Sequence, residues 1–151
     1  MQALTMPLKE LAEFEELCKR RMKEPGMIRI CGCVSSQKTH MMYAMSDGPK
    51  YKVIACSSES KAKQVYEEYR FLDARTYLYP AKDLLFYQAD LRSKELTRQR
   101  MEVIQAVITG EPVTVVTSFD AFMDSLLPKE VIEERMLHIA NDSPLDLDDM
   151  V

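Results

Sequence analysis

The feature that most constrains the fold is an alternation of short β-prone runs with amphipathic helical segments through the middle of the chain. Residues 52–56, 75–79 and 112–117 are runs of strand length that are rich in apolar side chains, and Ser or Pro follows each run. Residues 59–72 and 93–109 lie between the runs and carry apolar side chains at helical spacing. Strands that alternate with helices favour a parallel sheet covered on both faces. The sequence therefore predicts an α/β fold, with a parallel sheet flanked by helices.

Further elements are predicted before this alternation begins. Residues 7–23 have the apolar spacing of an amphipathic helix, which Pro25 and the glycine after it stop. Residues 27–32 are a short apolar run with a single charge, which is typical of a buried strand. Residues 38–45 suit a short helix. We therefore expect a sheet of at least four strands, and residues 27–32 are the first of them.

Serine residues mark two predicted helix starts. Ser57 and Ser58 follow a strand-like run, and their side-chain oxygens can cap the next helix. Ser118 follows the last run in the same way, and we expect it to cap a short helix that ends near Leu127 and Pro128.

The pattern changes after Pro128. Residues 134–140 have the composition of one more strand, and residues 141–144 resemble a turn that leads into a helix. A single helical turn is not stable alone. We therefore predict that residues 1–128 form one domain, and that residues 129–151 are the start of a second, truncated domain.

The overall charge bears on the class of partner. The formal net charge is −4 and the isoelectric point is near 5.3. This mild acidity argues against tight binding to a nucleic-acid backbone by the chain alone, which needs a basic surface. No segment approaches the roughly 20 apolar residues that a membrane span needs. We therefore expect a cytoplasmic protein that has no membrane contact.

The cysteine and histidine residues lack the spacing of a metal site. Cys31 and Cys33 form one close pair, and a zinc site would need a second pair. His40 and His138 do not supply it. We therefore expect reduced thiols and no metal site.

A sequence related to the phosphate-binding P-loop lies at residues 32–39. The P-loop reads G-x-x-x-x-G-K-[ST], between a strand and a helix, and its backbone amides enclose a phosphate. Gly32, Lys38 and Thr39 match this spacing, but Gln37 replaces the second glycine. That glycine permits a tight loop with a left-handed backbone angle, which glutamine adopts only at a cost. The pattern indicates descent from a P-loop fold, with a degenerate nucleotide site and no functional cofactor.

A P-loop hydrolase also needs an acid that holds Mg²⁺, usually at the end of a later apolar strand. Here the run at residues 113–116 is followed by Thr117 and Ser118. Asp120 and Asp124 come later, and we expect them on the solvated face of a helix. The sequence therefore predicts no catalytic site in this segment.

A basic group surrounds the start of the helix predicted at residues 93–109. Its members are Arg92, Lys94, Arg98 and Arg100. Side chains of this kind contact nucleic-acid phosphates, although nearby glutamates offset their charge, as on an ordinary solvated face. Both interpretations stay open: a solvated face, or a contact with nucleic acid or a partner. Several aromatic residues have the spacing of core residues, and their alternative role is stacking on bases: Tyr66, Tyr69, Tyr77, Tyr79, Phe86 and Tyr87.

Two short motifs carry a resemblance to a known family. Residues 77–84 (YLYPAKDL) resemble the segment with Tyr-Pro, an acid and Leu in bacterial transcription-repair coupling factors, the Mfd proteins. Residues 95–104 (ELTRQRMEVI) resemble their Glu-Leu-x-x-Gln-Arg-Leu helix. The strand at 113–117 and the closing residues 126–128 (LLP) follow in the family's order and spacing. The resemblance runs from about Leu8 to the end and covers nearly the whole chain.

This resemblance implies a fold and its partners. The amino-terminal region of that family is similar to the excision-repair protein UvrB, which implies a P-loop NTPase-like domain of the RecA and UvrB type. In that family the P-loop of this domain is degenerate, which agrees with the replacement of its second glycine by Gln37. An inserted second domain, which recruits UvrA, would begin near residues 129–135 and would be largely missing. The module that binds RNA polymerase and the translocase motor would lie far downstream.

The function implied by the resemblance is that of a non-catalytic domain in a DNA-repair translocase. The intact parent would displace stalled RNA polymerase by ATP-driven movement on duplex DNA and would recruit UvrA. One alternative is a small P-loop NTPase or kinase that uses Lys38 and Thr39. Another is a fragment of UvrB or of another helicase, and Gln37 speaks against UvrB, which keeps an intact Gly-Lys-Thr loop.

Overall fold

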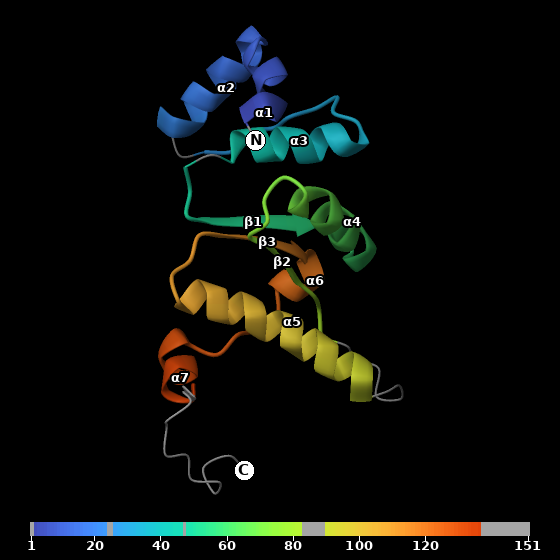
Figure 1. The fold of residues 1–151 in the computed structure, drawn as a ribbon, viewed down its shortest axis with the longest axis vertical. Coiled ribbons are helices and arrows are strands. Elements are labelled where there is room, and N and C mark those ends of the chain that lie inside the picture. The colour runs from blue at the N-terminus through green and yellow to red at the C-terminus, as the bar shows by residue number, and fades with distance from the viewer. Residues whose placement is uncertain (1, 24–25, 47, 83–89, 137–151) are drawn as a thin grey trace, which may run out of the picture.

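A parallel β-sheet lies at the centre of the structure, a computed structural model, and helices lie on both of its faces (Figure 1). The structure describes residues 2–23, 26–46, 48–82 and 90–136. Within them the sheet has three strands, in the order β1-β3-β2. The strands are β1 (Tyr51–Cys56), β2 (Thr76–Tyr79) and β3 (Val113–Ser118). Both pairings are parallel, with Val53 beside Val115 and Leu78 beside Val116. The predicted α/β class, with a parallel sheet flanked by helices, is confirmed.

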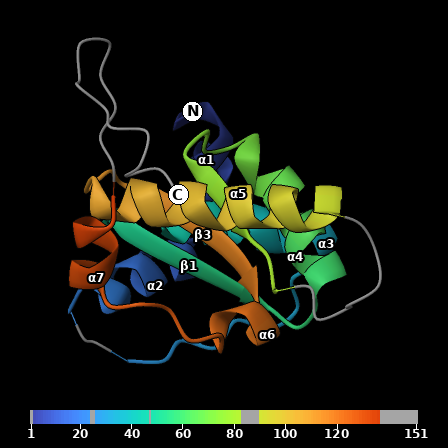
Figure 2. The ribbon, with the colours of Figure 1, turned by 90° about the horizontal axis from the view of Figure 1, so that it is seen from below.

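The two helices that connect the strands cover opposite faces of the sheet. Helix α4 (Glu59–Arg70) carries the chain from β1 past β3 to β2, and α5 (Asp90–Ile108) carries it back to β3. These two connections run in opposite directions across the sheet. Because parallel crossovers are right-handed, the helices must then lie on opposite faces. Figure 1 shows α4 above the sheet and α5 below it, and Figure 2 shows α5 in front when the sheet is seen from below.

The hydrophobic core follows this layering, and the central strand β3 is its most buried element. The core cluster on the α4 side contains Cys56, Ala62, Val65 and Val116. The cluster on the α5 side contains Tyr79, Val103 and Ala121. Both predicted serine caps are present: the Ser58 hydroxyl accepts from the Lys61 amide, and the Ser118 hydroxyl accepts from the Ala121 amide. These caps direct the chain away from the carboxyl ends of β1 and β3.

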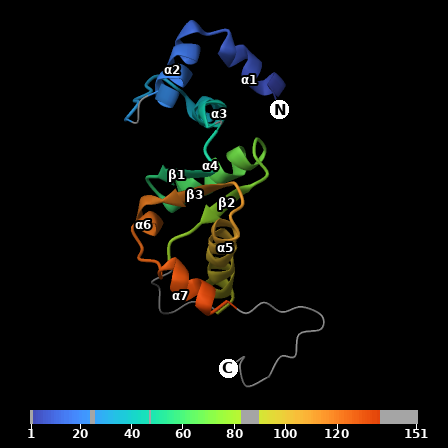
Figure 3. The same cartoon turned by 90° about the vertical axis from the view of Figure 1, so that its left-hand side faces the viewer.

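The amino-terminal helices form a layer above α4. The helix predicted at residues 7–23 is two helices, α1 (Gln2–Lys9) and α2 (Ala12–Lys23). A turn at Leu11, whose amide donates to the Leu8 carbonyl, separates them. The apolar spacing continues through this turn, which is why the sequence pattern did not reveal it. Helix α3 (Ser35–Met45) begins earlier than predicted, and Figure 3 shows α1 and α2 beyond it, away from the sheet.

The strand predicted at residues 27–32 is not present. These residues form no ladder with another strand, and Gly32 has a positive φ of 86°. Met27 is 93% exposed, so the apolar run is not buried as predicted. A strand needs a neighbour to accept its backbone hydrogen bonds, and the described residues provide none here. The described sheet therefore has three strands, and the prediction of at least four is wrong for this part of the chain.

The last described elements are short helices. Helix α6 (Phe119–Phe122) ends earlier than the predicted limit near Leu127. Helix α7 (Lys129–Glu134) has no buried residues, and it includes Glu134, where a strand was predicted to begin. Residues 137–140 of that predicted strand lie outside the described residues. In the part of the chain that the structure describes, no helix is both long and apolar enough to cross a membrane.

Candidate functional site

The sequence that resembles a P-loop begins in the loop between α2 and α3 and continues into the first turns of α3, outside the sheet. Gly32 adopts the left-handed conformation expected of a loop glycine. Ser35, the first residue of α3, has a φ of 30°, which is strained for a residue with a side chain. In a P-loop, a sheet strand delivers the chain to this point. Here residues 27–32 are not in the sheet, so the strand that would orient the loop is missing among the described residues.

The Gln37 side chain takes up one of the backbone amides at the start of α3. Its side-chain oxygen Oε1 accepts a hydrogen bond from the Val34 amide at 3.2 Å, and its own amide donates to the Val34 carbonyl at 2.8 Å. The free amides at a helix amino terminus are the groups that bind phosphate in a P-loop. The glutamine side chain satisfies one of them, as a capping residue does. Gln37 therefore acts as part of the cap of α3.

Thr39 has a structural role in place of a metal-binding one. Its side chain is 3% exposed, and its hydroxyl donates to Oε2 of Glu68 at 2.7 Å. Glu68 belongs to α4, so this hydrogen bond attaches α3 to the layer below. The corresponding hydroxyl of a P-loop binds Mg²⁺, whereas this one faces a buried contact between two helices. Lys38 is exposed and lines a cleft together with Gly32.

The carboxyl end of β3 carries hydroxyl groups where a P-loop hydrolase carries an acid. The Thr117 hydroxyl donates to the Tyr79 carbonyl at 2.9 Å, and the Ser118 hydroxyl donates to the Glu59 carboxylate. Asp120 is exposed, as predicted. Asp124 differs from the prediction: it lies beyond α6, is 28% exposed and forms an ion pair. None of these groups combines with Lys38 in the manner of a nucleotide site.

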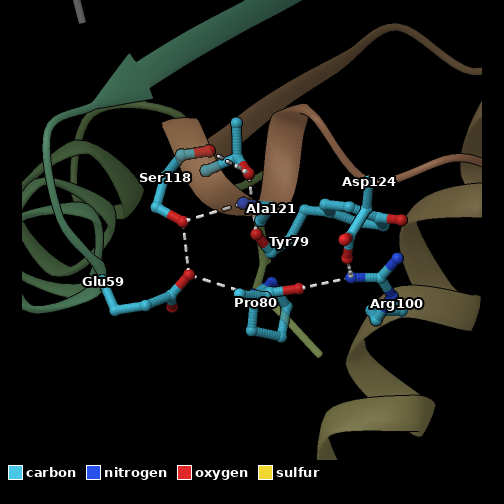
Figure 4. A network of polar contacts seen from close by, with 9 residues as sticks. Glu59, Tyr79, Pro80, Arg100, Ser118, Ala121 and Asp124 are labelled. Carbon is cyan, nitrogen blue, oxygen red and sulfur yellow. Dashed lines mark hydrogen bonds and ion pairs between the residues drawn. The ribbon is translucent and has the colours of Figure 1, made fainter. Parts of the chain in front are cut away.

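A polar network joins the carboxyl ends of β2 and β3 to α4 and α5 (Figure 4). Oε1 of Glu59 accepts from both the Ala81 amide, at 2.9 Å, and the Ser118 hydroxyl. Arg100 donates to the Pro80 carbonyl at 2.8 Å and to Asp124 at 3.0 Å. The network lies at the carboxyl ends of the strands, where open α/β sheets usually bind ligands.

Arg100 also connects the two motifs that carry the family resemblance. It is 8% exposed, and its guanidinium carbon lies 4.2 Å from the centre of the Tyr79 ring. Burial raises the pKa of the Tyr79 hydroxyl, and the charge of Arg100 partly opposes this shift. Because Tyr79 and Pro80 belong to one motif and Arg100 to the other, the motifs meet in the fold. Arg100 is therefore a buried structural residue and not part of a solvated face.

The rest of the basic group is divided by the structure. Arg98 is exposed and pairs with Glu95 at 2.6 Å and with Glu102. The hydrogen bonds between Arg98 and Glu95 raise the pKa of the arginine and lower that of the glutamate. Lys94 is exposed, and the side chain of Arg92 lies outside the described part of the chain. The three members whose side chains are described, Lys94, Arg98 and Arg100, therefore do not form one basic surface.

Of the aromatic residues that the sequence singled out for core packing or base stacking, Tyr69 and Tyr79 are buried. Tyr69 is fully buried, its ring contacts Tyr43 edge-on, and its hydroxyl lies 2.9 Å from that of Ser46. Burial raises the pKa of the Tyr69 hydroxyl. Tyr66 and Tyr77 are half-buried and line a small cavity of about 320 Å³ at the β2 edge. Phe86 and Tyr87 lie outside the described residues.

Metal-binding side chains do not gather within the described residues, where no group of three or more His, Cys, Asp or Glu residues could hold an ion. The four cysteines are free thiols: Cys18, Cys31, Cys33 and Cys56. Burial raises the pKa of the Cys56 thiol, which favours its protonated form.

Comparisons with known proteins return no relative for this chain. No protein-family model, no curated protein and no solved structure matches it.

Several residues of this site could not be identified from the sequence. Glu59 and Asp124 contact partners that are remote along the chain, and no local motif marks them. Gln37 was identified, because it breaks a known pattern, but its capping role became visible only in the structure.

Proposed function

We propose that this chain is the non-catalytic amino-terminal domain of a bacterial transcription-repair coupling factor. The parent would be a cytoplasmic, ATP-dependent DNA translocase that displaces stalled RNA polymerase and recruits UvrA. The segment would serve as a scaffold, and it would need no cofactor. The proposal combines the family resemblance with the α/β fold and with the state of the P-loop remnant.

The observation that carries the proposal is the use of the P-loop residues for structure. Gln37 caps α3 through the Val34 amide, and Thr39 is buried against Glu68. Both positions would have to be free for a nucleotide and its metal ion. The chain keeps the spacing of the P-loop motif, but the side chains of the motif have structural roles. This combination is expected of a nucleotide-binding fold that has lost its nucleotide site.

The contact between the two family motifs supports the resemblance. Arg100 binds the Pro80 carbonyl and packs on the Tyr79 ring, although 20 residues separate Arg100 from Pro80. A substitution at either Arg100 or the Tyr79–Pro80 pair would break this contact, so the identities of these residues depend on one another. This contact gives a physical reason for the two motifs to occur together in one chain.

The alternative with an observation in its favour is a small P-loop NTPase or kinase. Lys38 is exposed and lines a cleft of about 840 Å³, which is large enough for a nucleotide. However, much of this cleft is lined by apolar side chains such as Met41, Met42 and Ile54. An exposed lysine alone contributes little to binding, so this alternative is the weaker one.

Isothermal titration with Mg-ATP tests the proposal. We expect no binding by the unmodified chain and none by Gln37→Gly, because the described residues also provide no strand before the loop and no acid for Mg²⁺ at the carboxyl end of β3. Lys38→Ala is the control for nonspecific attraction of the phosphates. Binding in the micromolar range by the unmodified chain, lost in Lys38→Ala, would overturn the proposal and establish the NTPase or kinase. Binding by Gln37→Gly and not by the unmodified chain would show that Gln37 is the single residue that prevents nucleotide binding.

A further inference from the structure

A cavity of about 500 Å³ lies between α5 and α7, which are neighbours below the sheet (Figures 1 and 3). Its volume is within the range of sites for small molecules, about 300–1,000 Å³. Apolar side chains from both helices line this α5–α7 cavity, among them Met101, Ile104 and Ile132. A smaller hollow of about 340 Å³ shares Ile104, Leu126, Leu127 and Ile132 with it, so the two spaces lie side by side.

Two buried donors at these spaces have no hydrogen-bond partner among the described residues: Nη2 of Arg100 and the Tyr79 hydroxyl. Nη1 of Arg100 donates to the Pro80 carbonyl and to Asp124, and Figure 4 shows the guanidinium with another nitrogen directed away from both acceptors. Arg100 lines the α5–α7 cavity, and Tyr79 lines the smaller hollow. A buried donor without an acceptor destabilises a fold, so a ligand that brings an acceptor to this point gains a strong contact.

The charges around the cavity favour an anion. Arg100 lies inside it, and Lys82 and Arg135 line it as exposed side chains. No acidic side chain is among the described residues that line this cavity. Asp124 lines the neighbouring hollow and pairs with Arg100 at 3.0 Å, so it offsets part of the positive charge. A head group with a single negative charge therefore matches the cavity better than a dianion does.

The walls favour a small ligand with an apolar body. A water molecule or an inorganic anion would satisfy the two donors and leave the apolar walls without a contact. A partner helix would cover the exposed apolar side chains, but the unpaired donors lie in the interior, beyond the reach of its backbone. Entry is possible along α7, because this helix has no buried residues and its local displacement costs little.

We propose that the α5–α7 cavity binds a carboxylate with a single charge and an unbranched apolar chain, as in a fatty acid of medium length. The carboxylate accepts from Nη2 of Arg100 and from the Tyr79 hydroxyl, and Lys82 and Arg135 add their positive charge. The chain lies along the apolar walls that the cavity and the smaller hollow share. The site is independent of the proposed function, because it uses none of the residues of the P-loop remnant.

Titration of octanoate into the 151-residue chain tests this proposal, with methyl NMR signals of Ile104 and Leu127 as the readout. We expect saturable shifts at both residues. Octanamide is the matched neutral ligand, because it keeps the chain and a carbonyl acceptor and lacks the charge. It should bind at least about tenfold more weakly. Octyl phosphate carries the alternative oxyanion head, and as a dianion at pH 8 it should also bind more weakly than octanoate.

Leu127→Glu and Leu127→Lys are the matched variants. Leu127 is 59% exposed, so the fold should tolerate either side chain. Both substitutions remove the same apolar contact, and they differ in the sign of the charge that they place at the wall. We expect octanoate to bind at least about tenfold more weakly to Leu127→Glu than to Leu127→Lys. Arg100→Met should lose the preference for octanoate over octanamide, with circular dichroism as the control for folding; the Leu127 pair decides the question if this variant does not fold.

Three results would overturn the proposal. Absence of saturable shifts at Ile104 and Leu127 would show that octanoate does not enter the cavity. Equal affinities for octanoate and octanamide, or equal effects of the two Leu127 substitutions, would show that charge has no part in binding and would leave an apolar surface for a protein partner. Tighter binding of octyl phosphate than of octanoate would reject the carboxylate head and assign a phosphate in its place.

Discussion

The two edges of the sheet differ in length, burial and charge. β2 has four residues, and none of them is exposed. Side chains of α4 and α5, among them Arg70, Arg98 and Glu102, line the small cavity beside it. β1 has six residues, every second one along most of its length is exposed, and an open and largely apolar cleft lies beside it. Charged side chains therefore lie beside the β2 edge, whereas the β1 edge faces an open cleft.

This difference is informative because proteins usually protect an edge strand. Short strands and charged side chains prevent a sheet from pairing with another chain, and β2 has both. The outer side of β1 has neither kind of protection, because Lys52 pairs with Asp73, which also accepts from the Thr114 hydroxyl of β3. A long apolar edge is tolerated when another segment covers it. The outer edge of β1 is therefore the less protected of the two edges of the described sheet.

Proline substitutions along β1 should give the largest difference in stability. Ile54→Pro removes an amide on the β3 side and leaves a buried carbonyl of β3 without its donor, which costs about 1–3 kcal/mol before any strain is counted. Val53→Pro removes only an outward amide, and we expect a change within about 1 kcal/mol. Urea denaturation of both variants measures the free energies of unfolding. Equal losses would show that the outer edge of β1 is already paired.

On the β2 side, we expect Arg100→Met to destabilise the fold by about 2–4 kcal/mol. The substitution removes the hydrogen bonds that Arg100 donates to Asp124 and to the Pro80 carbonyl. Arg98→Met on the same helix is the control, and it should change stability little because its ion pairs are exposed. Thermal and urea denaturation would compare the two variants. A larger effect from Arg98 would contradict the assignment of Arg100 as the structural residue.

A smaller effect is expected at the P-loop remnant above β1. Thr39→Val removes the hydrogen bond to Glu68 and should cost about 1 kcal/mol, whereas Thr39→Ser keeps the hydroxyl and should cost less. Denaturation in the presence and absence of Mg-ATP gives the measurement. If the nucleotide stabilised the unmodified chain and not Thr39→Val, the hydroxyl would have a binding role that our account excludes.

The smallest effect concerns alkaline pH. Burial raises the pKa values of Tyr69 and Tyr79, so the fold favours their neutral forms. This contribution is complete below the unfolded pKa of about 10 and is lost as the pH rises through the folded values. The free energy of unfolding should therefore fall above about pH 10, and it should fall less in Tyr79→Phe. A pH titration of both proteins in urea would detect the difference, and parallel curves would contradict it.

The elements that the sequence predicted correctly have local signals. The strand-like runs at residues 52–56 and 112–117 are rich in β-branched or apolar residues, and the serines after them cap helices. Residues 27–32 carry a similar signal, but a strand also needs a neighbour, which this chain does not supply among its described residues. The sequence identified the residue types of a β-strand and could not show whether a partner was available.

The candidate site was predictable only in part, for a related reason. Gln37 breaks a motif of fixed spacing, so the sequence alone indicated a degenerate loop. The roles of Arg100 and Glu59 depend on contacts with residues 20 or more positions away. Such contacts exist only after the chain has folded, and a single sequence contains no record of them.

The reading frame beyond codon 151 tests the central claim most directly. A domain of a transcription-repair coupling factor must be followed by an inserted domain, an RNA-polymerase-binding module and a translocase motor. Our account predicts that sequencing the gene will find a continuous frame of some hundreds of further codons that contains helicase motifs. A stop codon directly after Val151, in an intact gene that has no separate helicase gene beside it, would contradict the account.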